Sequence, residues 1–388
     1  MDLNVNEKLG DIAADAGLTR VNILAWRDLD DPEAGGSERH AAEVARRFAE
    51  AGIEVTMRTS SVANRRREAR RDGYRIVRKA GRYMVFPRAA FSERMGWHGR
   101  NAAIVEIWNG MPFFSPLWAT GPRAAIVHHV HKEMWELTLS PRLAKLGRVI
   151  EERIAPRVYR NTEIVTVSES TKRELVDDLG LLEERIQVVR NGIDECFGLG
   201  LPEADVPLIA AVGRLVPVKR FDLLLDALAI ARRTIPNLRA VLAGDGYERD
   251  ALLEQRRALG AEEWIDMPGR LRRSELIALY QRAWVHASTS LREGWGMTIV
   301  EAAACGTPAV ATRVPGHVDS VVDDVTGLLA DATPEAIAAT LVALCNDHER
   351  RARLAANAHA RATQFSWDAT ARGVMEALAR DAQRRAHA

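Results

Sequence analysis

Short apolar runs alternate with longer amphipathic segments along most of the chain. The first apolar run lies at 21–26, an amphipathic segment follows at 37–51, and a second run rich in β-branched residues lies at 54–59. Ser37 is suited to begin a helix and Gly52 to end one. A strand, a helix and a second strand at this spacing predict a parallel β-sheet that is covered by helices.

The alternation continues to about residue 190 and begins again after an irregular stretch. Further strands of the first half are expected at 102–107, 124–129, 163–167 and 186–190, with a helix at 168–179. The stretch 198–207 is rich in Gly and Pro, which is typical of a linker. Strands of the second half are expected at 207–213, 238–244, 264–267, 284–288 and 309–312, with helices at 220–234, 247–259, 274–282 and 297–305.

This organisation predicts an α/β protein with two Rossmann-like parallel-sheet domains. We place an N-terminal acceptor domain at residues 1–200, a C-terminal donor domain at 201–365, and a C-terminal helix at 366–388 that crosses back to the first domain. Ligands of open parallel sheets bind beyond the carboxyl ends of the strands. We therefore expect both domains to direct loops into a central cleft.

Composition and charge indicate which classes of molecule the protein is expected to bind. Hydrophobic residues make up 47% of the chain and charged residues 28%, as in folded globular proteins. The net charge of +1 gives no strong field, and we expect no nucleic-acid partner. Residues 65–100, however, hold twelve Arg or Lys and three acidic residues. Two interpretations stay open for this basic stretch: attraction to an anionic acceptor or a lipid surface, and a solvated helix-and-loop face.

The cysteines and the apolar runs indicate the compartment. Cys196, Cys305 and Cys345 lie far apart and form no CxxC pair, which argues against a disulfide framework and a zinc site. The N-terminal segment lacks the basic-then-apolar pattern of a signal peptide, and no stretch reaches the ~18 apolar residues of a membrane span. We expect a cytoplasmic protein, with any membrane contact peripheral and at the inner face.

The segment after the strand at 207–213 carries two cations. It reads GRLVPVK, with Arg214 just past the strand and Lys219 near the start of the next helix. Breaking a sugar–phosphate bond builds negative charge on a departing diphosphate, which fixed cations and backbone N–H groups can stabilise without a metal. Arg gives a two-pronged contact to phosphate and Lys a mobile point charge. The other interpretation is that both residues face solvent.

A second segment leads from a glycine-bearing loop into an apolar helix near Met297. Residues 293–301 read EGWGMTIVE. Free N–H groups at a helix start form an anion site, and Gly294 and Gly296 allow a ligand to approach closely. The carboxylate of Glu301 can hold two ribose hydroxyls, and that of Glu293 can hold sugar hydroxyls. Two Glu eight positions apart are more often surface acids, but carboxylates in apolar surroundings need partners.

These segments resemble the retaining GT-B glycosyltransferases of sequence family four, or glycosyl transferases group 1. The family shows Glu, seven residues, Glu, an alanine-rich stretch and Cys-Gly-Thr-Pro, and residues 293–308 here read EGWGMTIVEAAACGTP. Further matches, in family order, are AGGSE at 34–38, NGID at 191–194, GRL with Lys at 213–219, and GDG at 244–246. The resemblance spans roughly residues 21–365. It departs from the family pattern at Arg220, where many members have Gly.

The resemblance implies a role for individual residues. Arg214 and Lys219 would grip the diphosphate, Glu301 the ribose and Glu293 the donor sugar. The other donor-binding residues that it implies are Gly35, Gly36, Arg270, Leu271, Gly294, Gly296, Met297 and Thr298. The family also places a histidine near the reacting sugar. Here the candidates are His128, His129 and His131, of which we favour His129 and then His128 as catalytic residues.

The function implied is a retaining hexosyltransferase that moves a sugar from a nucleotide-diphosphate sugar to an acceptor hydroxyl. It would need neither a metal nor another cofactor, with a UDP-sugar slightly favoured over a GDP-sugar and an anionic or lipid-linked acceptor. Asp28-Leu29-Asp30 resembles the metal-binding Asp-x-Asp of another transferase fold, but its place after the first strand favours a non-metal role. The alternatives are a non-catalytic nucleotide-sugar binding protein and a nucleotide-sugar epimerase of the same fold. The chain lacks the GxGxxG spacing of a dinucleotide-dependent oxidoreductase.

Overall fold

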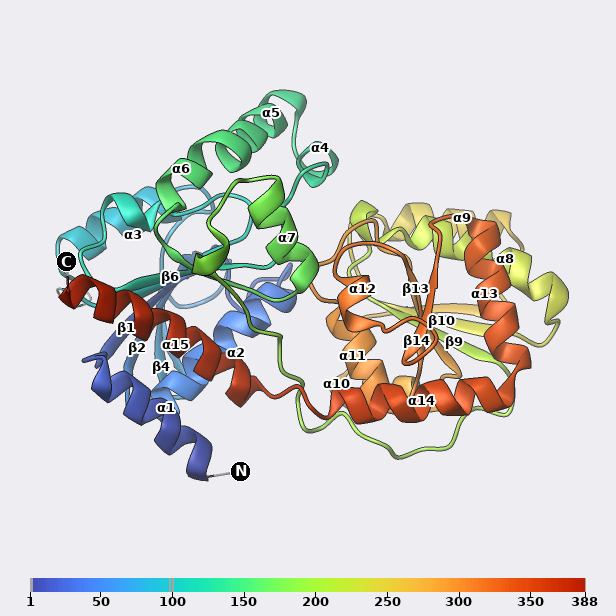
Figure 1. Ribbon diagram of the computed structural model, residues 1–388. Helices are drawn as coiled ribbons and strands as arrows, with labels where there is room; N and C mark the ends of the chain where they lie inside the picture. Colours follow the sequence, from blue (N-terminus) through green and yellow to red (C-terminus); the bar gives the residue numbers. More distant parts are fainter. Residues whose placement is uncertain (1–2, 98, 100, 388) are drawn as a thin grey trace. The chain divides into compact units, whose positions relative to one another are not determined.

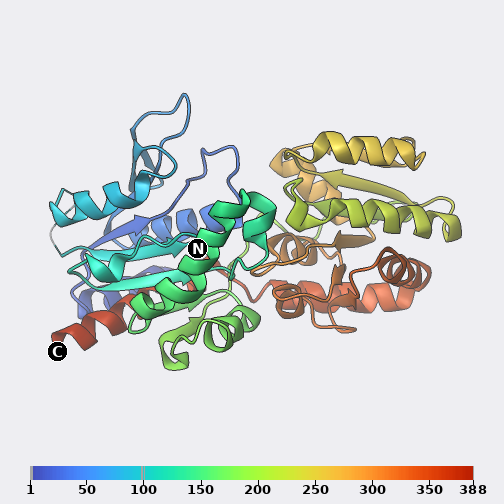
Figure 2. The ribbon, with the colours of Figure 1, turned by 90° about the horizontal axis from the view of Figure 1, so that it is seen from above.

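The computed structural model describes residues 3–97, 99 and 101–387, which form two compact units. Unit 1 comprises Met1–Gly192 and Trp367–Ala388, and unit 2 comprises Ile193–Ser366. Each unit is a largely parallel β-sheet with helices on both faces (Figures 1 and 2). The boundary precedes the one expected at 200–201 because the predicted linker packs on unit 2. There, Gly198 O accepts a hydrogen bond from Gln281 Nε2 (2.7 Å) and Ala204 O one from Trp284 Nε1 (2.7 Å).

Unit 1 holds an eight-stranded sheet in the order β3-β4-β2-β1-β5-β6-β7-β8. Its strands are β1 (Arg20–Leu24), β2 (Glu54–Ser60), β3 (Glu68–Arg71), β4 (Tyr74–Ala80), β5 (Ala103–Trp108), β6 (Arg123–Val127), β7 (Glu163–Thr166) and β8 (Ile186–Val188). Among the strands of the described residues of unit 1, only β3 and β4 pair antiparallel. The strand order reverses between β1 and β5, so the loops that follow these strands lie at the switch point where such sheets bind ligands.

Most helices of unit 1 bury apolar residues against this sheet. They are α1 (Leu3–Asp15), α2 (Gly36–Glu50), α3 (Val85–Arg94), α4 (Met134–Thr138), α5 (Pro141–Val149), α6 (Ala155–Tyr159), α7 (Glu169–Asp177) and α15 (Trp367–Ala386), with short turns at Ser115–Leu117, Ile150–Ile154 and Glu183–Arg185. Ser168 caps α7 as predicted, since its Oγ accepts from Thr171 N (3.2 Å). The N-cap predicted at Ser37 is wrong: α2 begins at Gly36, with Gly35 at the N-cap.

The described part of the basic stretch 65–100 forms the β3–β4 hairpin and α3, rather than only helix and loop. Several arginines of this stretch lie on strands and are paired inside the fold. The sequence of these strands is therefore rich in charge and lacks the apolar pattern by which a strand is predicted. Arg78 Nε donates to Asp28 Oδ2 (2.6 Å), and Arg71 Nη2 donates to Asp30 Oδ1 (2.9 Å). Both carboxylates of the Asp28-Leu29-Asp30 segment are therefore ion-paired with arginine.

Unit 2 holds a six-stranded parallel sheet in the order β11-β10-β9-β12-β13-β14. Its strands are β9 (Leu208–Val212), β10 (Arg239–Ala243), β11 (Ile265–Gly269), β12 (Val285–Ser288), β13 (Ala309–Thr312) and β14 (Gly327–Ala330). Its helices are η4 (Pro217–Lys219), α8 (Phe221–Thr234), α9 (Arg249–Ala258), α10 (Arg273–Arg282), α11 (Met297–Ala304), α12 (His317–Ser320), α13 (Pro334–Asn346) and α14 (His348–Ala362). The strand order reverses between β9 and β12, which makes the loops after these two strands the switch point of this unit.

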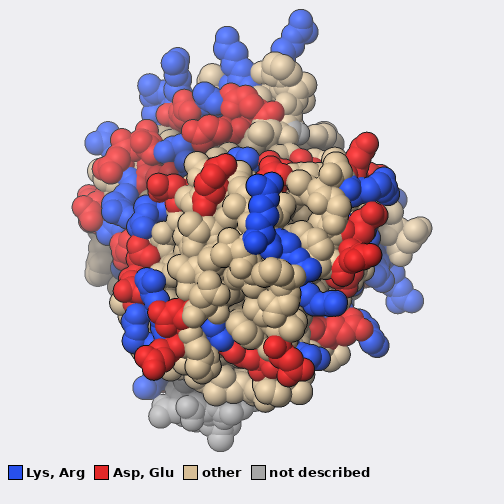
Figure 3. All heavy atoms as spheres, turned by 90° about the vertical axis from the view of Figure 1, so that its right-hand side faces the viewer, with Lys and Arg blue, Asp and Glu red and all other residues tan. Residues whose placement is uncertain are grey.

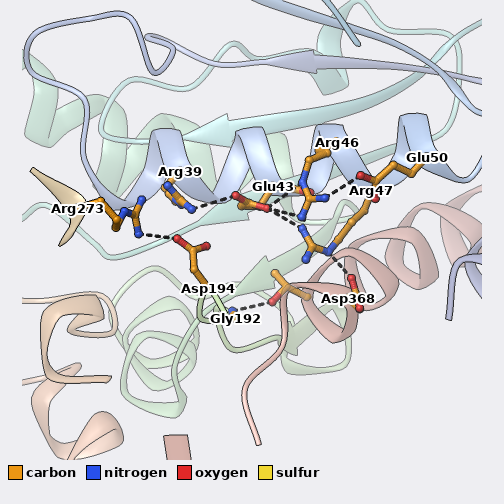
Figure 4. Close-up of polar contacts among 10 residues, drawn as sticks. Arg39, Glu43, Arg46, Arg47, Glu50, Gly192, Asp194, Arg273 and Asp368 are labelled. Atoms are coloured by element: carbon orange, nitrogen blue, oxygen red, sulfur yellow. Dashed lines mark hydrogen bonds and ion pairs between the residues drawn. The ribbon is translucent and has the colours of Figure 1, made fainter. Parts of the chain in front are cut away.

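The terminal helix α15 belongs to unit 1 and buries Met375 and Leu378 in its core. Arg47 on α2 forms ion pairs with Asp368 on α15 and with Glu43 (Figure 4). Thr370 Oγ1 accepts from Gly192 N (3.0 Å) and donates to Arg190 O (2.8 Å). These contacts fix the first turn of α15 to α2 and to the segment that leaves unit 1.

Surface charge is mixed on the face drawn in Figure 3, where basic and acidic side chains intermingle, in keeping with the net charge of +1. Among the described residues, no helix combines the length and the apolar character that crossing a bilayer requires.

Candidate active site

Two loops meet at the switch point of unit 2. The first follows β9 and runs to Arg220, and the second follows β12 and runs to Gly296. Leu291 N in the second loop donates to Val218 O in the first (2.8 Å), and Thr289 Oγ1 donates to Arg220 O (2.8 Å). These bonds join the loop that carries Arg214 and Lys219 to the loop that carries Glu293.

A stack of glycines supports the first loop. Gly213 N donates to Ala243 O (3.0 Å), and Gly244 N donates to Gly269 O (2.8 Å). A Cβ added to Gly244, whose φ is +149°, would lie 1.7 Å from Gly213 O. The Gly-Asp-Gly segment at 244–246 is therefore a backbone contact that only glycine permits, and Leu215 N adds a bond to Asp245 O (3.0 Å).

Lys219 and Glu293 form an ion pair between the two loops. Lys219 Nζ donates to Glu293 Oε1, and Ser290 Oγ donates to the same oxygen (2.9 Å). Burial alone would raise the pKa of Glu293, but Lys219, His317 and the hydrogen bonds outweigh it and hold that pKa below its ordinary value. The pair thus places an ionised carboxylate beside a cation at the strand ends.

Arg220, the residue that departs from the family pattern, lies at the start of helix α8. It is the N-cap residue of α8, with φ +50°, and its Nε donates to Asp222 Oδ1 (3.0 Å). The matching position is Gly in many members of the family that the chain resembles, and a positive φ is the conformation that favours Gly.

Helix α11 opens beside this ion pair. Its N-cap is Gly296, at φ +86°, and a glycine has no side chain that could cap the helix. Gly294 is buried and Met297 is half-buried. Thr298, which we expected to contact the donor, bonds through Oγ1 to His286 Nε2 (3.2 Å), a ring whose pKa burial lowers to about 3. The first turn of α11 therefore begins at a glycine in the left-handed region, where a ligand can approach the backbone closely.

Glu301 lies on the second turn of α11. Tyr280 OH donates to Glu301 Oε2 (3.1 Å), and Arg273 interacts with the same carboxylate electrostatically. Arg273 Nη1 also donates to Asp194 Oδ2 (2.7 Å), as Figure 4 shows. The Glu301 carboxylate is thus connected to the NGID segment at 191–194.

Two further predicted donor-binding residues follow β11: Arg270 is exposed, and Leu271 packs against the cluster that includes Ala210 and Leu279.

Sequence analysis missed three residues that support the predicted carboxylates: Ser290, His317 and Tyr280. His317 is buried and bonds through Nε2 to Ser288 Oγ (3.0 Å) and through Nδ1 to Thr312 O (2.9 Å). Burial lowers the pKa of His317 below its ordinary value, and the neighbouring Glu293 carboxylate acts in the opposite direction. Ser290 and His317 both follow strands that end at the switch-point edge, and that position was the available signal. Tyr280 carries no such signal within its helix.

In unit 1, Gly35 and Gly36 form the start of α2. Gly35 N donates to Glu38 Oε2 (2.8 Å), and Arg27 Nε donates to Glu38 Oε1 (3.2 Å). Ser37 Oγ also donates to Glu38 Oε2 (3.0 Å). The buried Glu38 carboxylate, which sequence analysis did not single out, therefore occupies the N-terminus of this helix.

The histidines after β6 have different surroundings. His128 is buried, its Nε2 lies 3.0 Å from His40 Nδ1, and burial lowers its pKa to about 4. His129 stacks on His131, with 4.6 Å between ring centroids, and His131 packs against Trp135 (5.0 Å). His128 is thus held by a partner on α2, whereas His129 belongs to a separate aromatic stack.

Comparisons with known proteins agree with this geometry. The family description "Glycosyl transferases group 1" matches residues 200–361, and "Glycosyltransferase Family 4" matches residues 34–196. D-inositol 3-phosphate glycosyltransferase of Kineococcus radiotolerans is 35% identical over 62% of this chain and 61% of that protein, so the chain spans less than two thirds of this relative. The protein of the same name from Thermobispora bispora is 31% identical over 90% of this chain and 91% of that protein.

Solved structures share the fold. Sucrose-phosphate synthase from Thermosynechococcus elongatus aligns with a TM-score of 0.79 at 20% identity, over 95% of this chain and 100% of that one. Anabaena Alr3699/HepE in complex with UDP and glucose aligns with a TM-score of 0.74 at 19% identity, over 92% and 98%. With two Rossmann-like units, family matches in both and a relative aligned over nearly its whole length, the chain belongs to the group 1 glycosyltransferases of sequence family four, which have the GT-B fold.

Proposed function

We propose that this glycosyltransferase is a metal-independent, retaining hexosyltransferase that uses a nucleotide-diphosphate sugar. The observation that carries the proposal is the Lys219–Glu293 ion pair, which lies beside the glycine N-cap of α11 at the switch point of unit 2. A cation and the N-terminus of a helix suit a diphosphate, and an adjacent carboxylate suits sugar hydroxyls.

The donor would be held mainly by unit 2. On arrival of a diphosphate, Lys219 exchanges Glu293 for phosphate oxygens, which frees the Glu293 carboxylate to accept from sugar hydroxyls. Arg214 adds a second cation, and the backbone of Gly296 and Met297 donates to phosphate. Glu301, already oriented by Tyr280, accepts from the ribose hydroxyls. The complexes of HepE with UDP and with UDP-glucose support a uridine donor over a guanosine donor.

The transfer step would proceed with retention. The acceptor hydroxyl oxygen forms a bond to the anomeric carbon on the face from which the diphosphate leaves. The bond between that carbon and the phosphate oxygen breaks, and the departing phosphate takes the hydroxyl proton. Arg214, Lys219 and the α11 amides stabilise the charge on the leaving group. We propose that Gly35, Gly36 and His129 of unit 1 act on the same donor, with His128 as the second candidate histidine.

The acceptor is proposed to carry a phosphate. The relatives from Kineococcus and Thermobispora are named for D-inositol 3-phosphate, and Arg65, Arg66 and Arg67 are exposed in the loop before β3. Exposed guanidinium groups are suited to phosphate because they donate two parallel hydrogen bonds.

The test is transfer with a defined product. The full chain is incubated with UDP- or GDP-hexoses, D-inositol 3-phosphate and EDTA, and the product is analysed by mass spectrometry and by NMR at the anomeric proton. We expect a glycoside that keeps the donor's anomeric configuration. An inverted product, or transfer only after a divalent metal is added, would contradict the proposal. Donor binding without turnover would favour the binding-protein alternative, and epimerised donor would favour an epimerase.

A further inference from the structure

Large apolar side chains gather on the outer face of α3 and the loops at its ends. Tyr83, Met84, Phe91, Met95 and Trp97 are 70%, 63%, 57%, 54% and 55% exposed. Met84, Phe91 and Met95 are spaced seven and four positions apart, which puts them on one side of a helix. The rings of Phe91 and Trp97 meet edge to face, with 5.6 Å between centroids. We name these five residues the α3 patch.

The exposure of the α3 patch does not come from a loosely attached helix. The opposite side of α3 buries Val85 and Ala89 against the sheet of unit 1, whose face α3 covers (Figure 1). Glu93 points inward, where Asn22 Nδ2 donates to its Oε2 (2.6 Å) and Arg58 Nη1 lies 3.6 Å from its Oε1. The helix is thus fixed on one side, and its apolar outer side is a permanent feature of the surface.

The same outer surface is basic. Arg88 and Arg94 are exposed on α3, and within the described part of the chain neither forms an ion pair. The only acidic residue of the helix, Glu93, is turned inward. Aromatic and apolar side chains alternating with unpaired arginines match the interface of an anionic bilayer, where rings lie at headgroup level and guanidinium groups meet lipid phosphates. A second copy of this chain would instead bring arginine against arginine across a symmetric interface, which is unfavourable.

We propose that the α3 patch, with Arg88 and Arg94, docks this protein on the surface of an anionic phospholipid bilayer. The apolar side chains enter the headgroup region and the arginines contact lipid phosphates. This contact is peripheral and depends on both the aromatic residues and the charge. It does not depend on which donor or acceptor the enzyme uses.

The test is co-sedimentation of the full chain with phosphatidylcholine vesicles, with and without phosphatidylglycerol. We expect wild type to bind the anionic vesicles and to bind neutral ones only weakly. The variant F91S/M95S/W97S should bind anionic vesicles at least about tenfold more weakly, because the inserted apolar area is gone. The variant R88Q/R94Q keeps that area and should lose roughly tenfold on anionic vesicles only.

A matched control uses two other exposed apolar residues of unit 1, Leu143 and Leu146 on α5, which are 50% and 51% exposed. L143Q/L146Q should bind like wild type, and circular dichroism and thermal unfolding verify that each variant is folded. The proposal is overturned if wild type ignores anionic vesicles, if both α3 variants bind as wild type does, or if the α5 variant alone loses binding. It is also overturned if sedimentation velocity shows a wild-type dimer that the α3 variants abolish, since the occupant would then be a second copy.

Discussion

The first turns of α2 in unit 1 and α11 in unit 2 differ in what stands beside their N-termini. Each follows the loop of a strand at a switch point, and each has glycine at the N-cap. In α2 the buried Glu38 carboxylate accepts from Gly35 N and from Arg27. In α11 the N-cap glycine has no side chain, and the carboxylate of the nearby Glu293 is held by Lys219. The N-terminus of α2 is thus neutralised by an internal carboxylate, and we propose that the N-terminus of α11 receives an external anion.

The largest expected effect tests the backbone that supports the unit 2 site. Gly244→Ala should destabilise the protein by about 3–5 kcal/mol, because the new Cβ would collide with Gly213 O. Gly260→Ala is the matched control: its φ is +61°, but nothing lies within 4 Å of the added Cβ, so it should cost only about 1 kcal/mol. Urea unfolding measures both variants. Equal costs would show that the glycine stack is unimportant.

The next prediction concerns the Glu301 carboxylate on α11, which we expect to act in donor binding, in contrast to the Glu38 carboxylate on α2. Glu301→Ala should reduce transfer at least about a hundredfold, with a raised donor KM, because the ribose loses its acceptor. The unfolding free energy of this variant should fall by about 1–2 kcal/mol, because the buried Tyr280 hydroxyl loses its acceptor. Glu335→Ala, on the exposed first turn of α13 in the same unit, should leave transfer unchanged. Turnover of Glu301→Ala at the wild-type rate would remove Glu301 from the donor site.

Glu38 should behave in the opposite way. Glu38→Gln leaves the buried Arg27 guanidinium with a weaker partner and α2 without its anion, and should cost about 2–3 kcal/mol of unfolding free energy. Glu50→Gln removes a partly exposed pair with Arg46 on the same helix and should cost less than about 0.5 kcal/mol. The comparison between the two helices fails if Glu38→Gln abolishes donor binding while stability stays at the wild-type level.

The last effect is a pH dependence that both units share, and it is the smallest when it is measured over a single pH unit. Burial lowers the pKa of His128 to about 4 and that of His286 to about 3, so both rings stay neutral in the fold while the unfolded chain takes up protons below pH 6.5. Stability should therefore fall as the pH drops from 6.5 toward 4, by about 1.4 kcal/mol per pH unit for each histidine. His128→Gln should make this slope shallower in urea unfolding. An unchanged slope would mean that His128 is protonated in the folded protein.

Sequence patterns predicted the parts of this molecule that depend on local order. Alternating apolar runs located most strands, and strand-end positions located Lys219 and Glu293, because parallel strands bring their carboxyl ends to one edge. The β3–β4 hairpin was missed, since its charges are paired with Asp28 and Asp30 from a distant segment. Tyr280 and His40 were missed for the same reason. Their roles come from partners that only the folded chain brings near.

The central claim is that Lys219, which pairs with Glu293 in unit 2, binds the donor diphosphate without a metal. Thermal unfolding with increasing UDP-hexose or GDP-hexose, in EDTA, measures this most directly. We predict a saturating stabilisation by one donor, near 2.7 kcal/mol at about a hundredfold excess over Kd. This stabilisation should be lost in Lys219→Ala. It should be kept in Arg220→Gln, because the guanidinium of Arg220 binds Asp222 in the wild-type protein. An equal stabilisation of Lys219→Ala, or one that appears only with added metal, would contradict the account.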